Sequence, residues 1–254
     1  MALTLYHAEP VANSLKCLAA LHEKGLPFTS RYVDLHRFEQ HEPWFVALNP
    51  DGQVPVLDHD GVIITQTTVI NEYLDDAFPD GAQLRPAGAL GRARVRAWNK
   101  FIDEHVMNHV SMHGWHRMVG VIARSIQGEE FEKLMARIPL KEQRDKWRTA
   151  RSGFSQQDLD EAERKITVAV ARVEAQLANS PWLAGETFSS ADINFFSHCG
   201  MMVARMFPHI GTMANCPRVL DWVERVKARP GMAAALKAED RTDPRLRTFT
   251  GHAK

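Results

Sequence analysis

The sequence has 254 residues, of which 44% are hydrophobic and 24% are charged. Its 31 lysine and arginine residues balance 31 aspartate and glutamate residues, so the formal net charge is +0 and nucleic acid is not expected as a partner. No apolar run is long enough to cross a membrane, and no export signal is visible at the N-terminus. Three widely spaced cysteines, Cys17, Cys199 and Cys216, favour free thiols in a reducing compartment, so we expect a cytoplasmic protein with no membrane partner.

The first 80 residues alternate short strand-like runs with helix-like runs. The order is strand, helix, strand, then a hairpin and a closing helix, which is what a thioredoxin-like α/β domain requires. The predicted strands are Leu3–Tyr6, Thr29–Asp34, Val54–Leu57 and Val62–Thr65, and the predicted helices are Asn13–Glu23 and Thr67–Ala77.

The breaker sequence Phe78-Pro79-Asp80-Gly81 ends this unit. We therefore expect a domain of residues 1–82 followed by an all-α helical bundle of residues 83–254. Apolar residues recur at helical spacing in Ala93–Val110, Leu159–Leu177, Ile193–Met206 and Val219–Val226. Ser189 and Asp192 have the spacing of a helix-capping box, which we interpret as structural.

The loop after the first strand delivers Asn13 and Ser14 to the start of the first helix. Either side chain could simply cap the helix, which is the commoner use of these residue types. A hydroxyl and an amide at the positive end of a helix dipole could instead stabilise a bound thiolate. Taken alone, the loop favours the cap. Cys17, three residues after Ser14, is interpreted as core packing.

Two further segments change this balance. Pro55 stands inside a predicted strand, where it cannot donate to the ladder, so a cis Val54-Pro55 bond is expected that turns the Val54 N–H and C=O outward to pair with an extended peptide. Gln66 and Thr67 open the next helix, whose N–H groups can hold a carboxylate, although a plain helix cap is the alternative. The three segments together give one domain a site for a thiolate, main-chain groups that can hold a peptide, and a site for an anion. This combination suits glutathione.

On these motifs the chain resembles the cytosolic glutathione transferases, and more narrowly the bacterial β-etherases of lignin breakdown that act on the β(S) ether. The segments that carry the narrower resemblance are Ala12-Asn13-Ser14-Leu15-Lys16, Phe38-Glu39-Gln40-His41, Gly52-Gln53-Val54-Pro55, Glu72-Tyr73-Leu74 and residues 146–154. The last lies in an additional segment of about residues 111–155. The resemblance implies the glutathione transferase fold, glutathione as cosubstrate and a homodimer.

The resemblance also implies roles for individual residues. Gln40 and His41 are expected near the glycyl carboxylate of glutathione, and Gln53 and Val54, with Pro55, are expected to hold the peptide. Gln66 and Thr67 are expected at the γ-glutamyl end. The relatives carry Glu before Ser at these last two positions, so an ion pair with the glutathione ammonium becomes a neutral hydrogen bond here.

The additional segment is rich in large apolar side chains, for which core packing is the default interpretation. Because ordinary transferases lack this segment, we expect Trp115, Met118 and Trp147 to form a wall on which aromatic substrate rings stack. His105, His109, His113 and His116 share a helix face, which favours a cleft or subunit interface over zinc, and no metal site is predicted.

The reaction these features favour is attack of the glutathione thiolate on the carbon that bears an aryl ether beside a ketone. Ser14 is expected to donate to the thiolate and Asn13 to assist. Two alternatives stay open. One is a transferase of the same fold that acts on a halide or epoxide, and the other is a non-catalytic glutathione-binding scaffold. An isomerase that regenerates glutathione is disfavoured because its Ser-rich loop with an Arg pair is absent.

Overall fold

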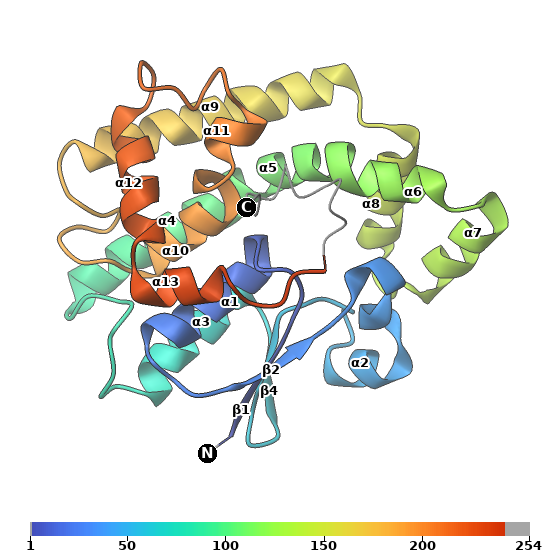
Figure 1. Cartoon of the computed structure of the whole chain (residues 1–254), viewed down its shortest axis with the longest axis horizontal. Coiled ribbons are helices and arrows are strands. Elements are labelled where there is room, and N and C mark those ends of the chain that lie inside the picture. Colours follow the sequence, from blue (N-terminus) through green and yellow to red (C-terminus); the bar gives the residue numbers. More distant parts are fainter. Residues whose placement is uncertain (1, 242–254) are drawn as a thin grey trace.

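The computed structural model describes residues 2–241, and Figure 1 shows a small sheet at one end of the molecule with helices stacked above it. The four strands are ordered β2-β1-β3-β4, with β1 and β2 parallel and the other neighbours antiparallel. Their bounds are β1 Leu3–His7, β2 Thr29–Tyr32, β3 Val56–His59 and β4 Val62–Ile64. This is the predicted thioredoxin-like arrangement, and the predicted fold class is confirmed.

Three α-helices accompany the sheet: α1 Ala12–Glu23, α2 Pro43–Leu48 and α3 Thr67–Ala77. Helix α1 makes the connection between the parallel strands β1 and β2, and its apolar residues, including Leu15, Leu18 and Leu21, are almost fully buried. The third strand begins at Val56, two residues later than predicted, because Pro55 lacks the N–H that a ladder needs. Strand β2 ends at Tyr32, two residues before the predicted end.

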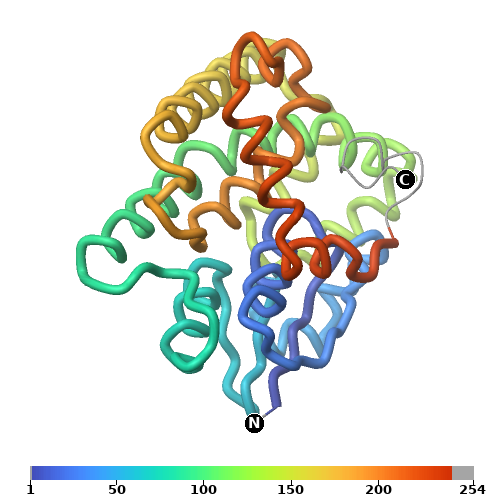
Figure 2. Tube along the Cα trace, turned by 60° about the vertical axis from the view of Figure 1, so that its left-hand side comes forward, coloured from blue at the N-terminus to red at the C-terminus, as the bar shows by residue number. Residues whose placement is uncertain are grey.

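After α3, the regular structure of the described chain is helical, apart from one isolated β-bridge between Trp182 and Gly185. The α-helices are α4 Ala89–His105, α5 Met107–Gly114, α6 Gly120–Ser125, α7 Gly128–Arg137, α8 Lys141–Ser152, α9 Gln156–Leu177, α10 Ser190–Phe195, α11 Val203–Met206, α12 Pro217–Lys227 and α13 Pro230–Ala235. The boundary predicted near residue 82 falls between α3 and α4. Helices α6, α7 and α8 stand together beside α2 (Figures 1 and 2).

Two of the predicted helical runs are interrupted. The run from Ala93 to Val110 is divided at Val106, whose backbone (φ −116°) departs from helical geometry. The run from Ile193 to Met206 contains a π-helical turn, Phe196–Gly200, and a second π-helical turn, Trp115–Val119, follows α5. Hydrophobic periodicity does not detect such local changes in hydrogen bonding.

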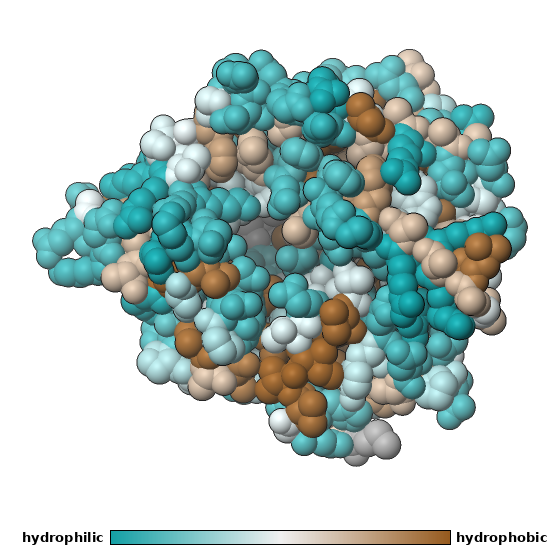
Figure 3. All heavy atoms as spheres, turned by 180° about the vertical axis from the view of Figure 1, so that it is seen from behind, coloured by the Kyte–Doolittle hydropathy of each residue, from teal (hydrophilic) through white to brown (hydrophobic). Residues whose placement is uncertain are grey.

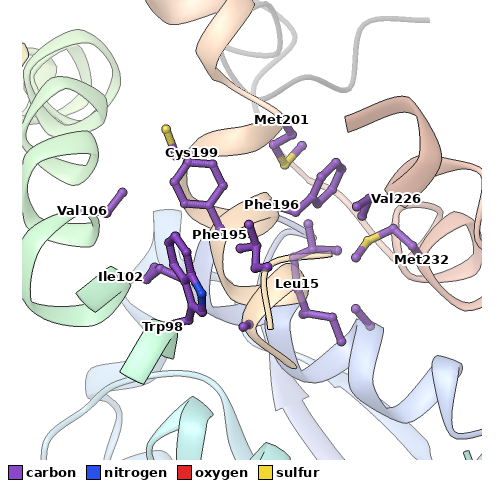
Figure 4. Close-up of a cluster of buried hydrophobic side chains, with 14 of the residues drawn as sticks. Leu15, Trp98, Ile102, Val106, Phe195, Phe196, Cys199, Met201, Val226 and Met232 are labelled. Carbon is purple, nitrogen blue, oxygen red and sulfur yellow. The ribbon is translucent and has the colours of Figure 1, made fainter. Parts of the chain in front are cut away.

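The largest hydrophobic core lies where α1 meets the C-terminal helices. Leu15 of α1, Ile102 of α4, Phe195 of α10 and Met232 of α13 belong to one buried cluster (Figure 4). Cys17 is fully buried in the same cluster, so its predicted packing role is confirmed. The two sequence halves therefore share a continuous apolar interior rather than meeting through a solvated surface.

Helix α13 covers the C-terminal end of α1. Arg229 donates to the Glu23 carboxylate over 2.6 Å, and the Met232 N–H donates to the same group over 2.9 Å. The approach is so close that a Cβ atom on Gly231 would lie 2.5 Å from the backbone nitrogen of Glu23. Only glycine fits at this contact without displacing one of the helices.

An ion pair between a buried lysine and a half-buried aspartate also joins the two halves. The Lys16 ammonium lies 3.3 Å from the Asp103 carboxylate, and the Lys16 side chain is only 2% exposed. Asp103 also accepts from the Thr68 hydroxyl over 2.8 Å and from the Asn194 amide over 3.1 Å. Such hydrogen bonds are what allow a charged pair to remain inside a protein.

The capping box is present as predicted at the start of α10. The Asp192 carboxylate accepts from the Ser189 N–H over 3.0 Å, and it also accepts from the Trp222 indole and the Leu183 N–H. Burial raises the pKa of Asp192 to about 6.

Among residues 2–241, no helix has the length and apolar character that crossing a membrane requires.

Candidate active site

Three predicted site segments emerge at the same end of neighbouring strands. Tyr6 pairs with Val56, so the loop after β1 leaves the sheet beside the Val54-Pro55 dipeptide that precedes β3. Leu57 pairs with Ile64, which brings the residues after β4 to the same end. The antiparallel register thus gathers the start of α1, the residues before β3 and the start of α3 at one edge of the domain.

Ser14 sits in the first turn of α1, and its side chain faces the preceding loop. The Ala8 N–H donates to Ser14 Oγ over 3.0 Å, and the residue is only 4% exposed. A hydroxyl that accepts in this way keeps its own proton for donation to a ligand. Val11 is the N-cap residue, and no side chain caps the helix, so the capping role considered for Asn13 and Ser14 is wrong.

The backbone at this entrance is unusual. Ala12 has φ +45°, in the left-handed region that a residue with a Cβ atom rarely adopts. The half-buried Asn13 follows it directly and precedes Ser14. Backbone strain of this kind costs about 1–3 kcal/mol and is concentrated at functional sites.

Gln40 and His41 form a buried polar pair in the short 3₁₀ turn Glu39–His41. The Gln40 amide nitrogen lies 3.3 Å from His41 Nε2. Because an amide nitrogen can only donate, Nε2 accepts and the imidazole proton resides on Nδ1. Burial, with a smaller contribution from Arg137, lowers the pKa of His41 to about 4, so the ring is neutral at pH 7.

The same pair has unused hydrogen-bonding capacity. Within the described residues, neither His41 Nδ1 nor Gln40 Oε1 has a partner although both atoms are buried. Most buried polar atoms in proteins are paired, so unpaired ones call for an explanation. A neutral imidazole that presents an N–H is suited to receive a carboxylate oxygen.

The Val54-Pro55 bond is cis, as predicted. Within residues 2–241, the Val54 N–H and C=O have no hydrogen-bond partner. The turn before them is fixed by Asn49, whose side-chain amide donates to the Gln53 carbonyl over 2.7 Å. The predicted peptide clamp therefore has both main-chain groups of Val54 available for a ligand.

Gln66 is the N-cap residue of α3, with φ +68° and no side-chain capping bond, so the capping alternative is wrong here too. Its side chain is exposed, and Thr67 begins the helix. The adjacent Thr68 borders a pocket of about 340 Å³ between α3 and α4. The pocket's ionic side chains are mutually paired or paired with neighbours. Within residues 2–241, the first N–H groups of α3 have no hydrogen-bond partner, as is usual at a helix start.

The additional segment contributes a second apolar cluster. Trp115 and Trp147 pack edge to face with ring centroids 5.4 Å apart, and Trp147 lies 4.9 Å from the ring of Phe38. Phe38 stands two residues before Gln40 and contacts the His41 ring, so this cluster reaches the Gln40–His41 pair directly. Met118 is half-buried in the same π-helical turn as Trp115 but does not belong to the cluster.

The predicted histidine face is divided between the end of α4, helix α5 and the π-helical turn after it, and it does not form one site. His113 is buried, packs on Phe207 and bonds the Leu159 carbonyl over 3.1 Å, whereas His105 packs on Phe101 and His116 on Phe154. Nowhere in residues 2–241 do three or more His, Cys, Asp or Glu side chains come together as a possible metal site.

Three residues of this region had no role assigned from the sequence: Phe38, Arg137 and Lys146. Phe38 contacts the rings of both Trp147 and His41. Arg137 donates to the Phe38 carbonyl and to Glu42. Lys146 begins the segment of residues 146–154 that resembles the β-etherases, and its position beside Trp147 is the signal in the sequence. The contact from α7 to the segment before α2 spans about a hundred residues of sequence, which local patterns do not reveal.

Family models for the glutathione S-transferase N-terminal and C-terminal domains match residues 1–76 and 114–230. The chain belongs to the glutathione transferase family. It is 43% identical over 247 residues to the protein LigF of Sphingobium sp. strain SYK-6, covering 96% of each chain. It is 28% identical over 237 residues to glutathione S-transferase 3 of Zea mays, covering 93% of this chain and 94% of that one.

Solved structures agree with this assignment. The crystal structure of beta-etherase LigF superposes with a TM-score of 0.90 at 42% identity, covering 94% of this transferase and all of that chain (100%). A glutathione S-transferase III in its apo form gives 0.68 at 27% identity, covering 94% and 97%. This chain is thus a glutathione transferase whose family uses glutathione as cosubstrate.

Proposed function

We propose that this glutathione transferase cleaves β-aryl ether bonds in aromatic ketones such as those derived from lignin. The observation that carries the proposal is the close likeness to LigF, whose structure is titled a beta-etherase and superposes with a TM-score of 0.90. Seven other transferases of known structure superpose with TM-scores of 0.68 to 0.71. The likeness to LigF therefore extends beyond the elements that these transferases share.

The reaction is a substitution at carbon. The glutathione thiolate attacks the carbon next to the ketone, the bond from that carbon to the aryl oxygen breaks, and its electron pair leaves on a phenolate. A free thiol with a pKa near 8.5 is only ~3% ionised at pH 7, whereas a pKa near 6.5 gives ~75% thiolate. In the proposal, the Ser14 hydroxyl donates to the sulfur and Asn13 assists.

The remaining predicted residues position the cosubstrate. His41 Nδ1, supported by Gln40, receives the glycyl carboxylate, and Val54 pairs with the peptide in an arrangement fixed by Gln53 and Pro55. The N–H groups at the start of α3 receive the γ-glutamyl carboxylate. The unpaired buried atoms at residues 40 and 41 and the free main chain of Val54 support this arrangement.

The aromatic substrate is proposed to lie against Trp115 and Trp147. Met118 is proposed to contact the substrate at the edge of this aromatic wall. The edge-to-face pair and its contact with Phe38 support this position because they join the additional segment to the glutathione-binding edge. Aromatic rings stacked in this way bind other rings with favourable geometry.

One incubation tests the function. Purified protein is mixed with glutathione and a racemic β-aryl ether ketone, and chiral chromatography follows the ether, the phenol and the glutathione thioether. Equal amounts of phenol and thioether, formed from one enantiomer, are expected. Conjugation of aryl halides or epoxides without phenol release would favour a different electrophile, and glutathione binding without any turnover would favour a scaffold.

We also infer a homodimer that works in the cytoplasm. Seen from behind, the surface is mostly hydrophilic, with a hollow near its middle and a hydrophobic patch toward the end that carries the sheet (Figure 3). Two large apolar side chains of the N-terminal domain, Val62 of β4 and Val69 of α3, are 61% and 55% exposed. Exposed apolar side chains of this kind support a subunit interface. The three cysteines are free and buried, which suits a reducing compartment. Light scattering at micromolar concentration tests the dimer.

A further inference from the structure

Lys146 is a sheltered cation on α8 that reaches across to α5. Its ammonium donates to the Ser111 hydroxyl over 2.9 Å and lies 4.6 Å from the centre of the Trp115 ring. Within residues 2–241 no carboxylate forms an ion pair with it, whereas Lys141, on the same helix, pairs with Asp145. A cation removed from water is normally paired, so a partly buried one without a counterion is a candidate for function.

The position of this ammonium follows from the ring contacts. Trp115, over which it lies, packs on Trp147, and Trp147 packs on Phe38 beside the buried Gln40–His41 pair. Figure 1 shows α8 next to α6, on the same side of the molecule as α2. Lys146 thus stands at the proposed aromatic wall, and Ser111 uses only one of its three N–H donors.

The other charged groups around α8 are engaged elsewhere. They bind main-chain carbonyls or one another: Arg124 binds the Ala150 carbonyl, Arg151 binds the Ala123 carbonyl, Arg144 binds the Ile138 carbonyl, and Arg148 pairs with Glu132. The ammonium of Lys146 is therefore the available cationic donor among these neighbours.

We propose that Lys146 is a catalytic acid that donates its proton to the phenolate expelled from the aryl ether. The inference rests on the proposed ether cleavage and adds the group that stabilises its leaving oxygen. As the carbon–sulfur bond forms and the carbon–oxygen bond breaks, the electron pair passes to the aryl oxygen. An Nζ–H bond then breaks and an O–H bond forms, leaving neutral phenol and a neutral amine.

The proton balance closes without another reactant. Glutathione releases its thiol proton to solvent when its thiolate forms, and the Lys146 amine takes one proton back from water before the next turnover. Burial lowers the pKa of Lys146 to about 8, whereas an ordinary phenol has a pKa of about 10. Transfer from ammonium to phenolate is then favourable by about 100-fold, which suits a general acid near neutral pH.

The test compares leaving groups in the full-length protein. Lys146→Met, Lys146→Arg and the control Lys141→Met are assayed with β-aryl ether ketones that release either an ordinary phenol or a nitrophenol. Lys146→Met should lose about 100-fold in kcat with the ordinary phenol and much less with the nitrophenol, whose anion needs no proton. Lys146→Arg should stay as slow as Lys146→Met, because guanidinium does not give up its proton.

The outcomes separate the two proposals. Wild-type protein that releases no phenol from any ether refutes the proposed function itself. Wild-type protein that releases phenol, with a Lys146→Met variant equally slowed for both leaving groups or not slowed at all, refutes the proton transfer. Full recovery in Lys146→Arg also refutes it, since charge alone would then suffice. Calorimetry with glutathione shows that each variant retains a folded cosubstrate site.

Discussion

A Cβ atom placed on Gly52 would lie 2.5 Å from Nδ1 of His41. The glycine also has φ +61°, so its absent side chain meets two separate requirements, one of backbone geometry and one of space for the imidazole. His41 Nδ1 is the atom that we propose for the glycyl carboxylate of glutathione. The turn before β3 and the carboxylate pocket are therefore built against each other.

Gly52→Ala should destabilise the protein and weaken glutathione binding. Gly61→Ala is the matched control, because Gly61 also has positive φ (+88°) but nothing lies within 4 Å of its added methyl group. Both variants should lose about 1 kcal/mol or more of unfolding free energy, and only Gly52→Ala should raise the dissociation constant for glutathione. Urea unfolding and calorimetry measure the two effects. Unchanged binding in Gly52→Ala would remove His41 from the site.

Ser14→Ala should raise the pKa of bound glutathione toward that of the free thiol. A return from about 6.5 to about 8.5 would reduce the thiolate roughly 25-fold at pH 7, and kcat/KM should fall comparably. The change also leaves the Ala8 N–H unpaired, at a cost of about 1–3 kcal/mol of stability. Ultraviolet titration of bound glutathione isolates the thiol pKa from this stability loss, and Ser125→Ala, an exposed change, serves as control. A variant with unchanged thiol pKa and turnover would contradict the assignment, most clearly if Asn13→Ala is added.

Asp103→Asn should destabilise the protein because it leaves Lys16 buried without a counterion. The expected loss is about 3 kcal/mol of unfolding free energy. Lys16→Met combined with Asp103→Asn should be more stable than Asp103→Asn alone, since the buried charge is gone. Denaturant unfolding of the single and double variants checks this. A double variant that is less stable than the single one would mean that the ion pair is not the group that matters.

His198 should make the protein sensitive to acid. Burial lowers its pKa to about 3, well below the value of 6.5 that it has when exposed. The unfolded chain therefore takes up this proton first, and stability falls as pH decreases from about 6.5 toward 3. The contribution of Asp192, with its pKa raised to about 6, has the opposite sign, because it is present at low pH and lost as pH rises through about 6. His198→Gln should flatten the fall of the melting temperature below pH 6.5, and the exposed His105→Gln should not. An equally steep fall in His198→Gln would assign the acid sensitivity to other groups.

The sequence predicts the glutathione-binding half of this fold well because its signals are local. Helix α3 has the predicted bounds, and the cis bond before β3 follows from a proline at a position where the ladder needs a donor. The capping roles considered for Ser14 and Gln66 were wrong, because the positions of these residues relative to the helix start depend on backbone angles at Ala12 and Gln66 that residue types do not reveal.

The aromatic side of the site was only partly predictable. Composition identified Trp115 and Trp147 as candidates, yet the contact between Trp147 and Phe38 joins residues more than a hundred positions apart. The unpaired state of Lys146 is likewise a property of three-dimensional surroundings, since Lys141 on the same helix is paired. Periodicity identifies which side chains are buried but not which ones meet.

Helix α1 bears the hydroxyl proposed to contact sulfur near one end and is covered by α13 at the other, where Glu23 receives Arg229 and Met232. The ribosome makes these two elements about two hundred residues apart. The face of α1 that α13 covers therefore stays exposed on the nascent chain until the roughly two hundred residues between them have been synthesised. Shortened chains that stop before α13 should depend on chaperones to remain in solution.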